Sequence, residues 1–128
     1  MWPFLWRRNT DPPRLTDPPA WMGEEVQSMT GKQPGDCRRI LTETTLQEYW
    51  SLTGDGPDDG DEHDEVEFNP AFAPALLRAT LEAEREVGPG GDDGYCFVFW
   101  ERKKRILRKR YGVRWKDPSD MNPESEYD

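Results

Sequence analysis

The sequence of 128 residues contains one histidine and two cysteines, which leaves little material for metal or nucleophile chemistry. Cys37 and Cys96 lie far apart and form no Cys-x-x-Cys pair, and two cysteines are too few for a disulfide scaffold. We expect both to be reduced, buried and small apolar side chains. His63 lies in a strongly acidic stretch, and we expect its imidazole to be exposed. The sequence also lacks the Gly-x-x-x-x-Gly-Lys loop that cradles phosphates.

Long apolar runs are also missing, so the sequence predicts no membrane span. The apolar stretch 2–6 is short and is followed, rather than preceded, by Arg7 and Arg8. This is the reverse of the order in a secretory signal. We therefore expect a cytoplasmic location and no membrane partner.

Leu, Ile, Val and Phe are scarce, with 21 residues in total, a proportion at which disorder becomes a concern. Six Trp, five Phe and four Tyr point the other way, because disordered chains are poor in aromatic residues. The length allows one domain. The composition therefore predicts one small, aromatic-rich core with polar extensions.

The predicted organisation has three parts. Residues 1–17 form an extended, Pro-rich arm, because consecutive prolines favour polyproline II geometry. Residues 18–116 form the folded domain, with an acidic, Gly- and Pro-containing loop at 54–67. Residues 117–128 form a turn-rich tail. We predict a mainly α single domain of three to four short helices.

Helix signals place the first two of these helices. Asp17 and Pro18 suit the start of a helix over 18–30, which Gly31 would end. A capping box formed by Thr44 with Gln47, or by Thr45 with Glu48, precedes a helix that ends near Gly54. The stretch 37–44 fits either a strand or the approach to that helix.

The last two helices are more strongly amphipathic. Asn69 and Pro70 begin one that ends before Gly88. Asp93 is the expected cap of a final helix that reaches Tyr111 and ends before Gly112. Tyr95–Trp100 alone would also fit a buried strand. We prefer the helix because the apolar and basic residues stay segregated to its end.

Two cations, Lys103 and Arg110, fall on the apolar side of this final helix, and we expect them to snorkel to solvent. Trp115, just beyond the helix, is expected to fold back onto the core.

Charge is distributed unevenly along the chain, whose formal net charge is −9. Residues 101–116 carry nine basic residues and one acidic residue, and the remainder carries a net charge of −17. Five cations gather on one side of the final helix: Arg102, Lys104, Arg105, Arg108 and Lys109. They can be a solvated face, can pair with the acidic loop, or can bind a protein partner or phosphates.

Trp2, Phe4 and Trp6 alternate in the N-terminal arm. Three large aromatic side chains are costly to expose, so we expect them to dock on the domain or to anchor a partner.

The acidic loop supports weaker hypotheses. Its oxygen ligands could bind a divalent cation, with Asp59, Asp61 and His63 alternating as candidates, but the spacing does not match an EF-hand. The loop could instead bind a basic toxin, as an immunity-type protein would. Asp58, with Glu101-x-Lys103, resembles the Pro-Asp…Glu-x-Lys arrangement of a large nuclease superfamily, which would require 95–100 to be a strand.

The sequence thus favours a non-enzymatic interaction protein: an adaptor, an inhibitor or immunity-type partner, or a small assembly subunit. Nucleic-acid binding through 101–110 is the main alternative, because those cations suit phosphate contacts. A metal-dependent nuclease is the third hypothesis. We assign no catalytic residue, no metal ligand and no cofactor, and the oligomeric state stays open.

Overall fold

The computed structural model describes residues 13–54, 56, 60–90 and 93–127, and within these ranges the fold is all-α with no strand. The helices are α1 (Ala20–Thr30), α2 (Pro34–Glu43), α3 (Leu46–Thr53), α4 (Ala73–Val87), α5 (Tyr95–Tyr111) and α6 (Pro118–Met121), with 3₁₀ helices η1 (Glu65–Phe68) and η2 (Pro70–Phe72). The mainly α prediction is confirmed. The predicted number of three to four helices was too low, because it omitted α2 and the single-turn α6.

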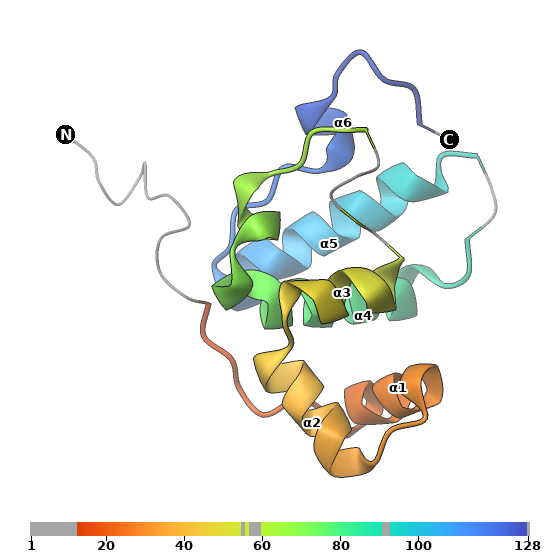
Figure 1. Ribbon diagram of the computed structural model, residues 1–128. Coiled ribbons are helices and arrows are strands. Elements are labelled where there is room, and N and C mark those ends of the chain that lie inside the picture. The colour runs from red at the N-terminus through yellow and green to blue at the C-terminus, as the bar shows by residue number, and fades with distance from the viewer. Residues whose placement is uncertain (1–12, 55, 57–59, 91–92, 128) are drawn as a thin grey trace.

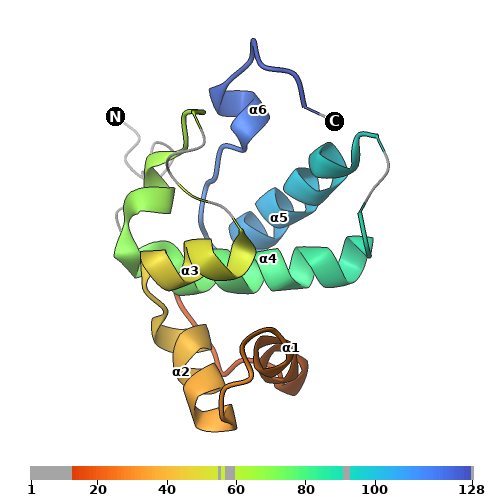
Figure 2. The same cartoon turned by 45° about the vertical axis from the view of Figure 1, so that its right-hand side comes forward.

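Helix α4 lies at the centre of the molecule (Figures 1 and 2). Helix α5 packs along one side of it, and α1, α2 and α3 contact it from other directions. Ten of its 15 residues are buried, which explains why alanine is frequent in its sequence. Small side chains let several helices approach the same central helix closely.

Most of the buried core comes from two stretches of the chain, residues 37–53 and 70–115. Ile40, Leu41 and Tyr49 come from the first, and Leu76 and Leu107 from the second, and all are buried. Beyond α5 the chain folds back, so that Val113 and Trp115 are also buried, as predicted for the tryptophan. Cys37 is free and buried as expected, whereas Cys96 is only partly buried.

Capping residues and glycines in the local sequence correctly predicted some of the helix ends. The Thr45 hydroxyl accepts a hydrogen bond from the Glu48 backbone N–H, and the Glu48 carboxylate accepts one from the Thr45 backbone, which completes a capping box. Asn69 caps η2, which leads directly into α4. Gly112 follows α5 with φ of +66°, a left-handed conformation that glycine adopts without a Cβ clash.

Two predicted caps were wrong. Asp17 does not cap α1; its carboxylate instead pairs with Arg38 at 2.8 Å. Asp93 does not cap α5, because Gly94, with φ of +80°, occupies the N-cap position. In both cases a neighbouring residue suited to the required backbone geometry takes the cap position.

The C-terminal end of the predicted loop 54–67 is helical, because the 3₁₀ helix η1 begins at Glu65. The Asp64 carboxylate accepts a hydrogen bond from the Val66 backbone N–H and begins this turn. The interpretation of 65–67 as loop was therefore wrong.

None of the helices in the described residues combines the length and apolar character that crossing a bilayer requires.

A buried arginine joins the centre of the fold to the N-terminal part of the chain. Arg78 on α4 is 1% exposed. Its Nε donates to the Leu41 carbonyl at the end of α2, and its Nη1 donates to the Thr16 carbonyl, each at 2.7 Å. Burial lowers the pKa of Arg78 below its ordinary value, but a guanidinium stays charged at neutral pH.

We predict that Arg78→Met lowers the free energy of unfolding by about 2–3 kcal/mol, because the buried Leu41 carbonyl loses a charged donor. Urea denaturation followed by circular dichroism measures this change. The matched control is Arg105→Met at an exposed site, which should alter stability by less than about 0.5 kcal/mol. Equal effects of the two substitutions would contradict a special role for Arg78.

Candidate functional site

Helix α5 carries the predicted basic residues and has two distinct sides. Ile106 and Leu107 are buried, and α5 packs against α4. On the other side Arg105, Arg108 and Lys109 are exposed. The α4 contact therefore fixes which cations face solvent.

Two of the five predicted cations are held in ion pairs. Arg102 lies 3.4 Å from Glu86 on α4. Lys104 Nζ lies 2.8 Å from the Asp117 carboxylate and 2.7 Å from the Asp120 carboxylate, beside and within α6. The anions are thus supplied by α4 and by residues 115–127, which we call the C-terminal segment.

The other three cations have no hydrogen bond or ion pair within the part of the chain that the structure describes. Val98 lies seven residues before Arg105 and eleven before Lys109, which places it on the same side of the helix. It is 56% exposed. We call Val98, Arg105, Arg108 and Lys109 the outer face of α5. The other predicted partner-binding residues, Trp2, Phe4 and Trp6, lie outside the described residues.

Lys103 does not snorkel to solvent as predicted. It is 2% exposed, and its Nζ donates a hydrogen bond to the Tyr49 hydroxyl at 2.8 Å. The same nitrogen lies 4.7 Å from the centre of the Trp115 ring, a cation–π distance. Arg110, the other cation predicted to snorkel, is exposed and pairs with Glu82 at 2.9 Å.

His63 was predicted to be exposed, and this prediction was wrong, because its side chain is only 8% accessible. Its Nδ1 lies 3.3 Å from Glu67 Oε1, and Glu67 Oε2 accepts a hydrogen bond from Trp115 Nε1 at 3.1 Å. Glu67 is itself buried. The acidic stretch thus supplies a carboxylate that holds the imidazole and the indole together.

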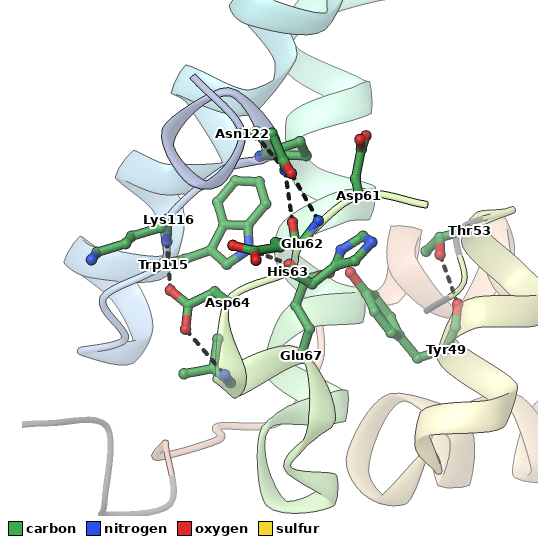
Figure 3. Close-up of polar contacts among 12 residues, drawn as sticks. Tyr49, Thr53, Asp61, Glu62, His63, Asp64, Glu67, Trp115, Lys116 and Asn122 are labelled. Atoms are coloured by element: carbon green, nitrogen blue, oxygen red, sulfur yellow. Dashed lines mark hydrogen bonds and ion pairs between the residues drawn. The ribbon is translucent and has the colours of Figure 1, made fainter. Parts of the chain in front are cut away.

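Further hydrogen bonds join residues 61–67 to the C-terminal segment (Figure 3). The Asp64 carboxylate accepts a hydrogen bond from the Lys116 backbone N–H at 2.7 Å. The Asn122 side chain accepts from the Glu62 N–H and donates to the Glu62 carbonyl, each at 2.8 Å. Residues 61–67 and 115–122 are therefore held side by side.

A pocket of about 210 Å³ lies among these elements. Its buried lining residues are Glu67, Thr80, Lys103 and Trp115. Glu84 is exposed, so the pocket reaches solvent on that side. We call this the Lys103 pocket. Sequence reasoning missed it, although a lysine on the apolar side of α5 was a usable signal.

The geometry does not support the nuclease or metal hypotheses. Residues 95–100 are helical, whereas the nuclease pattern requires a strand there, and Asp58 lies outside the described residues. Across the described ranges no group of three His, Cys, Asp or Glu side chains is arranged to hold a metal ion. Asp59, one of the three residues considered as metal ligands, is also outside those ranges.

No protein-family model matches the chain, and comparisons with curated proteins and with solved structures found no match.

The charges around the start of α6 give a test of how the C-terminal segment is held. Burial would raise the pKa of Asp117, but hydrogen bonds from Lys104, Ser119 and the Asp120 backbone outweigh it and hold this pKa below its ordinary value. A carboxylate with a lowered pKa stabilises the fold above its unfolded-state pKa of about 3.9 and loses that contribution as the pH falls through its folded value.

We predict that Asp117→Asn lowers the free energy of unfolding at neutral pH by about 1 kcal/mol, because the ion pair with Lys104 is lost. Below about pH 4 the difference between the two proteins should shrink. Urea denaturation of both proteins at a series of pH values measures it. A difference that stays constant into strong acid would show that the ion pair contributes nothing.

Proposed function

We propose that this protein is a non-enzymatic interaction protein that binds an acidic surface of a protein partner through the outer face of α5. The observation that carries the proposal is the set of three exposed cations, Arg105, Arg108 and Lys109, which are left without partners among the described residues. They project from a rigid helix, so binding them does not require ordering a loop.

The character of this interaction follows from the exposure of the charges. Exposed ion pairs contribute less than about 1 kcal/mol each, so the cations would mainly orient the partner and accelerate its association. Val98, on the same side, offers an apolar contact. We therefore expect binding that weakens as the salt concentration rises.

Nucleic-acid binding is the second candidate, because the same three cations could contact phosphates. The chain outside 101–116 carries a formal charge of −17. This charge repels a long polyanion such as a nucleic acid more strongly than it repels a local acidic patch on a protein. This imbalance favours a protein partner. The adaptor, inhibitor and assembly-subunit roles all remain compatible with it.

An immunity-type protein that presents residues 55–67 to a basic toxin receives less support. The carboxylates of Asp64 and Glu67 already accept internal hydrogen bonds, from Lys116 and Trp115. Both of these side chains are also buried. Buried carboxylates held in this way contribute less to a new interface.

We predict that Arg105→Glu with Arg108→Glu weakens capture of the protein partner from native lysate at least about tenfold. Tagged wild-type protein should retain a discrete acidic protein that survives nuclease treatment and elutes with salt. Quantitative mass spectrometry of the retained fraction measures the difference.

The matched control is Arg14→Glu with Lys32→Glu, which changes the net charge equally at exposed sites away from α5. This control should retain the partner. If retention were unchanged in the α5 variant, the proposal would be wrong. If only nucleic acid were retained, and the α5 variant lost it, the second candidate would replace the first.

A further inference from the structure

The Lys103 pocket is separate from the outer face of α5, because Lys103 and Arg105 are two residues apart and point to opposite sides of the helix. Its walls come from five parts of the chain: the 61–67 segment, the end of α3, α4, α5 and the C-terminal segment. Figure 3 shows how the first and last of these are joined by hydrogen bonds. The pocket is therefore a product of the tertiary fold.

The buried part of the pocket is polar and firmly held. Lys103 is fixed by the Tyr49 hydroxyl, and Glu67 by His63 and Trp115. Burying an ammonium and a carboxylate has a desolvation cost that apolar side chains of similar volume would avoid. Departures of this kind from an apolar interior concentrate at functional sites.

The charge of the lining indicates which ligand would fit. The pocket is lined by three carboxylates, from Asp61, Glu67 and Glu84, and by one lysine. The three carboxylates outnumber the two groups that can carry a positive charge, Lys103 and His63, so the lining is net negative. Glu67 and Lys103 are buried, whereas Glu84 is exposed and Asp61 is partly exposed. A positive group entering from solvent would meet Glu84 and Asp61 first.

Aromatic side chains provide the apolar part of the lining. Trp100 and Tyr127 form an edge-to-face pair with ring centres 5.0 Å apart, and both line the pocket. Aromatic faces attract organic cations and pack against flat apolar groups. An enclosed cavity of about 150 Å³ holds benzene, so a pocket of about 210 Å³ has room for a ring with a short substituent.

We propose that the Lys103 pocket binds a small organic amine, with its ammonium group against Asp61 and Glu84 and its flat apolar part against Trp100 and Tyr127. This proposal does not depend on the outer face of α5. A partner on that face and an amine in the pocket would occupy different sides of the helix.

Three probes of similar shape test the proposal: benzylamine, benzyl alcohol and benzoate, which differ in charge. Calorimetry should detect benzylamine in the millimolar range or tighter, where ligands of this size bind. Binding should be about tenfold tighter than that of benzyl alcohol, because a charged hydrogen bond replaces a neutral one. Benzoate should bind more weakly than the alcohol. The Trp115 indole N–H resonance, which reports on the Glu67 contact, should shift with benzylamine.

Variants locate the binding site. Glu84→Gln and Asp61→Asn should each weaken benzylamine binding about tenfold. Asparagine at position 61 can still accept the Tyr127 hydrogen bond, so this variant should keep the C-terminal segment in place. Glu43→Gln on α2, the same chemical change at an exposed site outside the pocket, should leave binding unchanged.

Three results would overturn the proposal: no benzylamine binding at millimolar concentration, equal affinity for the three probes, or equal weakening by Glu43→Gln. The double variant Arg105→Glu with Arg108→Glu should bind benzylamine as the wild type does. Loss of partner capture without loss of amine binding, or the reverse, therefore separates a failure of the proposed function from a failure of this inference.

Discussion

The burial of Lys103 between Tyr49 and Trp115 is the constraint on which the functional surfaces depend. A lysine inside a small domain must find a hydrogen-bond acceptor or lose its charge. Here the Tyr49 hydroxyl of α3 accepts from it, which fixes the rotation of α5 about its own axis. Once Lys103 faces inward, helical geometry directs Arg105, Arg108 and Lys109 outward. The exposed basic face is thus a consequence of a buried contact.

The same contact organises the acidic half of the molecule. Trp115 covers the Lys103 ammonium, and its indole N–H donates to Glu67, so the segment after α5 and the segment before α4 are drawn together. Glu67 in turn holds the His63 imidazole. An acidic run that would repel itself in an open loop becomes ordered where its carboxylates accept hydrogen bonds from the C-terminal segment. The dipolar charge distribution of the sequence is therefore partly neutralised inside the fold.

These contacts separate what local sequence signals could predict from what they could not. The Gly112 terminator and the helical pattern over Tyr95–Tyr111 depend on neighbouring residues and were predicted correctly. The Thr45–Glu48 capping box is one of the two that the local sequence allowed. Lys103 and His63 were predicted wrongly, because their surroundings come from distant parts of the chain. Tyr49 lies 54 residues from Lys103. A cation within an apolar helical stripe indicates either snorkelling or a buried partner, and periodicity alone cannot distinguish them.

The opposed placement of the two proposed sites on α5 has a physical consequence for how they interact. Lys103 is buried in the wall of its pocket, whereas Arg105 is exposed on the other side of the helix, so occupancy of one site does not block the other. Coupling between them would require α5 to rotate or shift, since two sites influence each other only through a structure that both can bias. Such a movement would break the Lys103–Tyr49 hydrogen bond and the packing of Leu107 on the core. Because both contacts are buried, their loss is costly, and the two sites should therefore bind their ligands independently.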